Sequence, residues 1–80
     1  MTMLAVFKSR SETLAFLTDL RGSGAPASAM STPKEAGVGC GLSARFEETF
    51  LPRARNVLSR RSYGSFAGFM KKNGFGYAYI

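Results

Sequence analysis

Residues 3–22 read MLAVFKSRSETLAFLTDLRG, and within them the sequence changes from the pattern of a strand to that of a helix. Met3–Lys8 is a short apolar run of strand formers that ends in polar residues, which predicts a buried first strand. Ser9 and Glu12 have the spacing of a capping box, in which each side chain accepts an N–H group left free at a helix start. The chain is therefore expected to pass directly from a strand into a helix.

This first helix has one apolar face. Its positions follow the spacing i, i+3, i+4, i+7 and are occupied by Thr13, Phe16, Leu17 and Leu20. Gly22 follows the last of them, as is typical of a helix end. A helix with a single apolar stripe packs on one layer, so we expect it to cover a sheet.

Three further segments follow this helix. After a turn at Ser23–Pro26, the small residues of Ala27–Ser31 predict a weak strand. The loop Pro33–Gly41 comes next. In residues 42–47, apolar and polar side chains alternate, which predicts a strand with one face, including Ser43, in water.

A second helix is predicted by another apolar stripe. Its members are Phe50, Leu51, Ala54, Val57 and Leu58. Thr49 is the expected cap, and Pro52 lies in the first turn, where its missing N–H does no harm. The opposite face carries the cations Arg53, Arg55, Arg60 and Arg61.

The C-terminal part has the pattern of a β-hairpin. Two aromatic-rich runs, 66–72 and 75–80, flank Asn73-Gly74, the strongest short hairpin signal. A two-residue turn there would place Met70 opposite Tyr77, Gly68 opposite Tyr79 and Phe69 opposite Ala78. One face would then gather the large side chains Phe66, Met70, Tyr77 and Tyr79.

These elements predict one domain spanning residues 1–80. Their order is βαββαβ with an extra C-terminal strand, an α+β sandwich of ferredoxin-like type with two helices on one face of an antiparallel sheet. The other face would expose aromatic side chains. We therefore expect a homodimer formed through the sheet face.

Composition limits the class of protein. Eleven Lys and Arg against five Asp and Glu give a net charge of +6, which attracts anionic partners. The start of the chain has no basic segment followed by a long apolar span, and none occurs later. A single cysteine forms no internal disulfide. We expect a soluble, cytoplasmic protein that does not bind membranes.

The only cysteine marks the candidate site. Cys40 lies between Gly39 and Gly41, whose bare N–H groups suit a developing anion, and Lys34 or Arg45 would supply positive charge. The chain has no histidine, so it has no Cys-His nucleophile pair, and its acids form no metal-ligand cluster. We expect no cofactor and no metal. Two interpretations stay open: a reactive thiol, or a small buried side chain that anchors the loop.

Two segments of the sequence resemble a known family. Thr32-Pro33-Lys34-Glu35 and Cys40-Gly41-Leu42-Ser43-Ala44-Arg45-Phe46 are similar to the family called domain of unknown function 3343, described as selenium/sulfur carrier-like proteins. The order of elements agrees as far as about Arg61. Serines usually precede the cysteine in that family, whereas this chain has residues 36–39, Ala-Gly-Val-Gly.

The resemblance implies a carrier and not an enzyme. The thiolate of Cys40 would accept a sulfur or selenium atom from a donor protein and pass it on. In the same loop, Pro33 would fix the turn. Glu35 is either solvated or a proton donor or acceptor to the thiol.

A different class of function also fits the composition. The cations Arg53, Arg55, Arg60, Arg61, Lys71 and Lys72, with aromatic residues of the C-terminal hairpin, would suit single-stranded nucleic acid. A docking surface for another protein is a further alternative.

Overall fold

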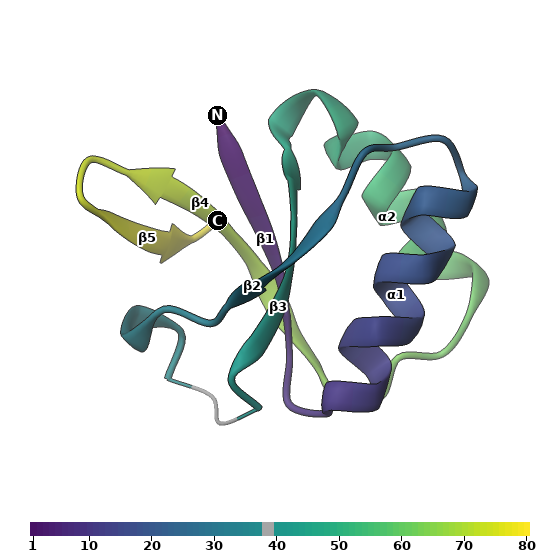
Figure 1. Ribbon diagram of the computed structural model, residues 1–80, viewed down its shortest axis with the longest axis horizontal. Coiled ribbons are helices and arrows are strands. Elements are labelled where there is room, and N and C mark those ends of the chain that lie inside the picture. Colours follow the sequence, from purple (N-terminus) through teal and green to yellow (C-terminus); the bar gives the residue numbers. More distant parts are fainter. Residues whose placement is uncertain (38–39) are drawn as a thin grey trace.

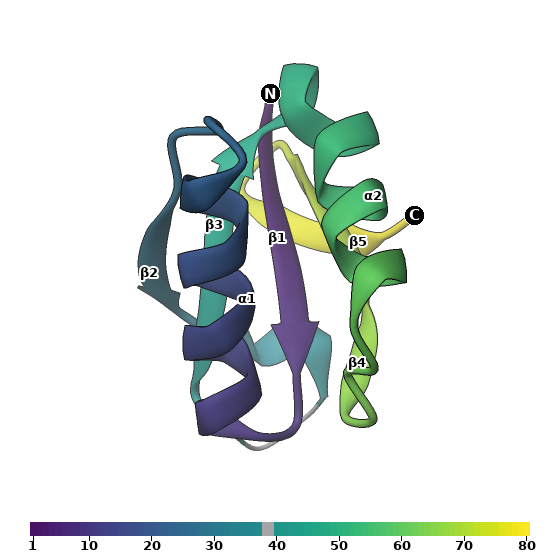
Figure 2. The ribbon, with the colours of Figure 1, turned by 90° about the vertical axis from the view of Figure 1, so that its right-hand side faces the viewer.

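The computed structural model describes residues 1–37 and 40–80. The elements are β1 (Thr2–Phe7), α1 (Arg10–Gly22), β2 (Ser28–Ser31), the 3-10 turn η1 (Lys34–Ala36), β3 (Leu42–Glu47), the 3-10 turn η2 (Glu48–Phe50), α2 (Leu51–Arg60), β4 (Phe66–Asn73) and β5 (Gly76–Tyr79). The strands form one sheet in the order β2-β3-β1-β4-β5. Both helices lie on the same side of it (Figures 1 and 2).

The sheet confirms the predicted fold class. Every neighbouring pair of strands is antiparallel, and β1 runs through the centre between β3 and β4. The order β2-β3-β1-β4, with a helix after β1 and another after β3, is that of a ferredoxin-like βαββαβ sandwich. β5 is the extra strand, added at the β4 edge.

The main core lies between the sheet and the two helices. Met3, Ala5 and Phe7 of β1 face this side and are fully buried. The Phe7 ring contacts three other rings, with centroid distances of 5.2 Å to Phe16, 5.5 Å to Tyr63 and 5.3 Å to Phe66. Tilted aromatic contacts of this kind add to the free energy gained from burial alone. They join β1, α1 and the start of β4.

A second, smaller core lies on the opposite side of β1. Leu4, Val6 and Met70 are fully buried there with Ala36, and Tyr77 packs against them. Their cover comes from η1 and the β4–β5 hairpin, which lie on the side of the sheet away from the helices (Figure 1). The chain thus buries much of the face for which a dimer was expected. A homodimer stays a prediction, to be measured by light scattering.

The first helix begins at the predicted cap, but half of the capping box is replaced. Ser9 Oγ accepts a hydrogen bond from the backbone N–H of Glu12 at 3.3 Å. The Glu12 carboxylate instead accepts from the N–H (2.8 Å) and hydroxyl (2.6 Å) of Ser65. These hydrogen bonds from Ser65 lower the pKa of Glu12. The Ser9 N–H donates to Ser65 Oγ at 3.1 Å, so Ser65 takes the place of the reciprocal contact.

Two local predictions are wrong, one because of a 3-10 turn and one because of tertiary cover. Thr49 is not a cap, because Glu48–Phe50 forms a 3-10 turn and α2 begins at Leu51 without a side-chain cap. Ser43 is fully buried and not in water, since η1 and the hairpin cover its side of the sheet. Its hydroxyl forms a hydrogen bond of 2.7 Å with the hydroxyl of Thr32, because a buried polar group needs a hydrogen-bond partner.

The hairpin forms with a turn one residue later than predicted. Asn73 pairs with Gly76 and Met70 with Tyr79, so the two turn residues are Gly74 and Phe75. Gly74 has a φ of 63°, and glycine at the first turn position is typical of a type II′ turn. The three predicted pairs are therefore wrong by two residues on β5. A shift of two leaves each side chain on its predicted face.

A β-bulge in β4 changes the face of one aromatic residue. Val6 pairs with Gly68 but Phe7 pairs with Phe66, so Ala67 is an extra residue opposite β1. Phe66 consequently packs in the main core, whereas Met70 lies in the second core. The prediction that these two side chains share a face is wrong, because a bulge reverses the alternation of the strand.

Gly68 is predicted to be required for the position of β5. Its φ is 152°, and a Cβ there would lie 2.9 Å from Cδ1 of Tyr79. Gly68→Ala is expected to lower the free energy of unfolding by about 1–3 kcal/mol, measured by urea denaturation. Gly64→Ala is the matched control, since nothing lies within 4 Å of its Cβ position and little change is expected. Equal stabilities of the two variants would contradict this role.

The contacts between Glu12 and Ser65 are predicted to make stability depend on pH. Because the pKa of Glu12 is lowered by folding, its contribution is fully present above the unfolded value of about 4.3 and is lost as the pH falls through the folded value. Glu12→Gln should therefore be less stable than the unmodified protein at pH 7. This difference should shrink in urea denaturation below about pH 4. A difference that stays constant with pH would contradict the prediction.

Candidate functional site

The candidate site is the loop that joins η1 to β3. Thr32 N–H donates to Gly41 O at 3.1 Å and closes the base of this loop. Gly37 and Gly41 have φ values of 70° and 78°, a backbone region that favours glycine. Gly39, which was predicted to support the thiol, lies outside the described residues. Cys40 itself is partly buried and is separated from the start of β3 by Gly41 alone.

The thiol is held by its own loop and by α1. Cys40 Sγ lies 3.0 Å from Leu42 O, to which the thiol can donate, and accepts the Leu42 N–H at 3.4 Å. The hydroxyl of Thr13 is 3.7 Å from the same sulfur. Among residues 1–37 and 40–80, the sulfur therefore has one backbone N–H and one hydroxyl as potential donors. The residue as a whole is partly exposed, and access of a reagent to its sulfur is a prediction to be measured by labelling.

Thr13 connects the cysteine loop to the first helix. Its side chain is fully buried, and Oγ1 lies 3.1 Å from Leu42 O and 3.2 Å from Ser9 O. The sequence placed Thr13 in the apolar stripe of the helix but gave no indication that it contacts Cys40. A threonine within an otherwise apolar stripe was the only available signal, because buried hydroxyls require a partner.

Glu35 lies against β5. Its carboxylate accepts the Tyr77 N–H at 3.1 Å. Nearby, the Tyr79 hydroxyl donates to Ala36 O at 2.7 Å. These contacts fix η1 to the hairpin, so the structure assigns Glu35 an anchoring contact on β5.

The two remaining residues of η1 have local roles. Pro33 precedes η1 with an extended backbone (φ −68°, ψ 155°), and its carbonyl accepts the Ala36 N–H at 3.1 Å. The side chain of Lys34 is exposed, and within the part of the chain that the structure describes it makes no hydrogen bond or ion pair.

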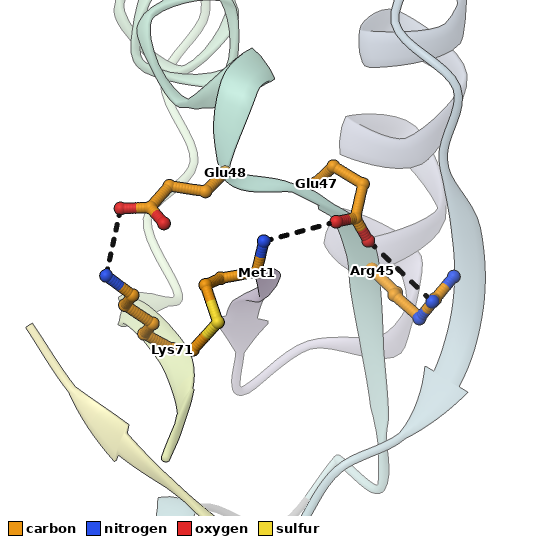
Figure 3. Close-up of polar contacts among 5 residues, drawn as sticks. All are labelled: Met1, Arg45, Glu47, Glu48 and Lys71. Carbon is orange, nitrogen blue, oxygen red and sulfur yellow. Dashed lines mark hydrogen bonds and ion pairs between the residues drawn. The ribbon is translucent and has the colours of Figure 1, made fainter. Parts of the chain in front are cut away.

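Arg45 faces away from the thiol. Ala44 and Phe46, its neighbours on β3, belong to the main core, so Arg45 lies on the opposite face of the sheet. Its guanidinium pairs with Glu47 at 3.8 Å. Figure 3 shows this pair with those of the Met1 amino group and Glu47 (3.4 Å) and of Lys71 and Glu48 (3.0 Å). Cys40 precedes β3, whereas these contacts lie at its far end, so the structure does not place Arg45 beside Cys40.

Several cations of the predicted anion-binding set have partners within the chain. Arg53 donates to Ser23 O at 2.9 Å, Arg55 lies 5.6 Å above the Phe69 ring, and Arg61 pairs with Asp19 at 3.3 Å. Lys71 pairs with Glu48, as described above, while Arg60 and Lys72 are exposed. The basic face of α2 therefore stabilises the fold in part, as stacked and paired arginines do.

Asp19 also binds the hydroxyl of Tyr63. Burial of Tyr63 and this contact raise the pKa of Tyr63 to about 12. Tyr63 thus fills the main core with a neutral phenol that donates to a carboxylate, between α1 and the segment that leads to β4. This cluster lies apart from the cysteine loop and belongs to the packing of the two helices.

The described part of the chain contains no cluster of His, Cys, Asp and Glu side chains that could hold a metal ion. In residues 1–37 and 40–80, no helix has the length and apolar composition needed to cross a membrane.

Comparison with known proteins gives one match. Neither curated proteins nor solved structures match the chain. A family model, described as "Putative Se/S carrier protein-like", matches residues 2–69. This span contains β1, both helices, Cys40 and β3, and it confirms the resemblance carried by residues 32–35 and 40–46. Because it covers most of the 80 residues, the chain belongs to the "Putative Se/S carrier protein-like" family.

Proposed function

We propose that the chain carries a sulfur or selenium atom on Cys40 and has no reaction of its own to catalyse. One observation carries the proposal: Cys40, the chain's only cysteine, is a partly exposed residue whose sulfur lies beside a backbone N–H and a hydroxyl that can stabilise it as an anion. Membership of a family named for carriers supports it. The anion matters because the thiolate, and not the thiol, is the nucleophile.

The transfer step requires no oxidant. A donor persulfide, written R–S–SH, is attacked at its terminal sulfur by the Cys40 thiolate. A new S–S bond forms to Cys40, the donor's S–S bond breaks, and the donor leaves as a thiolate. The product is a persulfide on Cys40. Attack by an acceptor nucleophile on its outer sulfur reverses the exchange and releases the Cys40 thiolate.

The surroundings of Cys40 support a carrier more than a hydrolytic or general acid–base role. In such enzymes a base, usually histidine, lies within hydrogen-bonding reach of the nucleophilic cysteine. The sequence of this chain contains no histidine. Glu35, the acid nearest to Cys40 in sequence within its loop, binds β5. A carrier needs only an accessible sulfur, an anionic form, and a partner on each side of the exchange. A donor protein is therefore the partner that this function requires.

Loading of Cys40 is the first prediction of this proposal. Incubation with a cysteine desulfurase and cysteine should raise the intact mass of the protein by the mass of one sulfur atom, and a thiol reductant should remove it. Cys40→Ser should gain no mass, because it lacks the only thiol. An equal gain in the Cys40→Ser variant, or none in the unmodified protein, would rule out the carrier role.

The accessibility of the thiol is a separate prediction. Iodoacetamide should label Cys40 in the folded protein, since the side chain is only partly buried. Labelling in denaturant provides the fully exposed reference rate. If the folded protein were labelled only as fast as it unfolds, Cys40 would be a structural residue of the loop.

A further inference from the structure

We propose that Thr13 is a positioning residue for Cys40, whose hydroxyl donates to the sulfur when the sulfur carries negative charge. This inference rests on the proposed carrier function. Thr13 belongs to α1 and Cys40 to the loop before β3, so the two residues are brought together by the packing of the helix on the sheet.

The hydroxyl of Thr13 lies among three acceptors. Oγ1 is 3.2 Å from Ser9 O, 3.1 Å from Leu42 O and 3.7 Å from Cys40 Sγ. It has a single proton and can therefore donate to one of them at a time. The side chain is fully buried, so water does not compete for that proton. Which acceptor receives it depends on the state of Cys40.

In the thiol state the other acceptors are satisfied without Thr13. The S–H group donates to Leu42 O at 3.0 Å, and the Thr13 backbone N–H donates to Ser9 O at 3.1 Å. The hydroxyl adds a second donor to one of these carbonyls, as serine and threonine commonly do within a helix. Rotation of the Thr13 hydroxyl toward another acceptor therefore costs little free energy, because both carbonyls keep a donor.

In the thiolate state the sulfur needs donors. Loss of the S–H proton leaves an anion that accepts the Leu42 N–H at 3.4 Å but is repelled by the Leu42 carbonyl oxygen at 3.0 Å. Rotation of the Thr13 hydroxyl toward Sγ supplies a second, charge-assisted hydrogen bond. The same donor stabilises Cys40 as the leaving group when the outer sulfur passes to an acceptor. Thr13 therefore acts on both the loading and the unloading step.

Charged side chains on the surrounding elements are directed elsewhere. Glu12 of α1 binds Ser65, and Arg45 of β3 pairs with Glu47 on the other face of the sheet. Lys8 and Arg10, which flank the start of α1, are exposed. In the described part of the chain, the donors within reach of Sγ are thus neutral. With no charged donor beside the sulfur, a hydrogen bond from the Thr13 hydroxyl should measurably stabilise the Cys40 thiolate relative to the thiol.

The test compares alkylation rates of Thr13→Val and the unmodified protein. Valine has the shape of threonine without the hydroxyl. A lost hydrogen bond to the anion reduces the thiolate fraction by about tenfold or more, and the remaining thiolate is more nucleophilic. Iodoacetamide labelling at neutral pH should therefore be about threefold to tenfold slower, with the pH–rate profile moved to higher pH. Thr13→Ser keeps the hydroxyl and should therefore show the labelling rate and the pH–rate profile of the unmodified protein.

Thr18→Val is the matched control, because Thr18 is an exposed threonine of the same helix. It should be labelled at the unmodified rate. Thermal unfolding monitors the fold, and Thr13→Ala replaces Thr13→Val in the comparison if valine prevents folding. Labelling of the hydroxyl-free variant at the unmodified rate, with an unmoved pH–rate profile, would overturn the proposal. Failure of the unmodified protein to take up sulfur would instead overturn the carrier function, since labelling measures the thiol without a donor.

Discussion

The whole structure depends on burying β1 on both of its faces. Met3 to Phe7 are each fully buried, and the strand is hydrogen-bonded on one edge to β3 and on the other to β4. Two helices cover one face, while η1 and the β4–β5 hairpin cover the other. A strand that is apolar on both faces needs cover on both sides, which an open two-layer sandwich does not provide. The extra strand and the loop supply the missing layer.

This second layer also determines where the thiol lies. Ala36 is buried in the second core, so η1 is fixed on that side of the sheet. Cys40 follows η1 in the chain and is separated from β3 by one residue. Its sulfur lies 3.7 Å from the hydroxyl of Thr13, in the first turn of α1 on the helical side. The site is therefore formed where the two layers of cover meet at one end of β3.

Much of the fold could be predicted from periodicity. Apolar spacing and the positions of Gly and Pro predict the two helices, the five strands and their order along the chain, because these patterns are local. The bulge at Ala67, opposite β1, and the burial of Ser43 depend on contacts between distant segments. A local pattern carries no information about them.

The site could be predicted only in part. Cys40 is conspicuous as the only cysteine and lies between two glycines in the sequence, and Pro33 directly precedes η1. Proximity in sequence suggested Glu35 and Arg45 as its partners, but one binds β5 and the other lies on the far face. Thr13 is 27 residues away from Cys40 in the sequence, and its position in the apolar stripe of the helix predicted packing and not a contact with the thiol. Distance along the chain was thus a poor guide to distance from the sulfur.

The hydroxyl of Tyr79 has a consequence for how the loop can move. Together with the contact between Glu35 and the Tyr77 N–H, it attaches η1 to β5, and the Tyr79 ring in turn rests on Gly68. β5 lies beyond residue 69, where the match to the family model ends. A displacement of β5 relative to β4 would have to break these two hydrogen bonds or carry η1 with it. The placement of η1, the turn that precedes Cys40 in the chain, thus depends on strand β5.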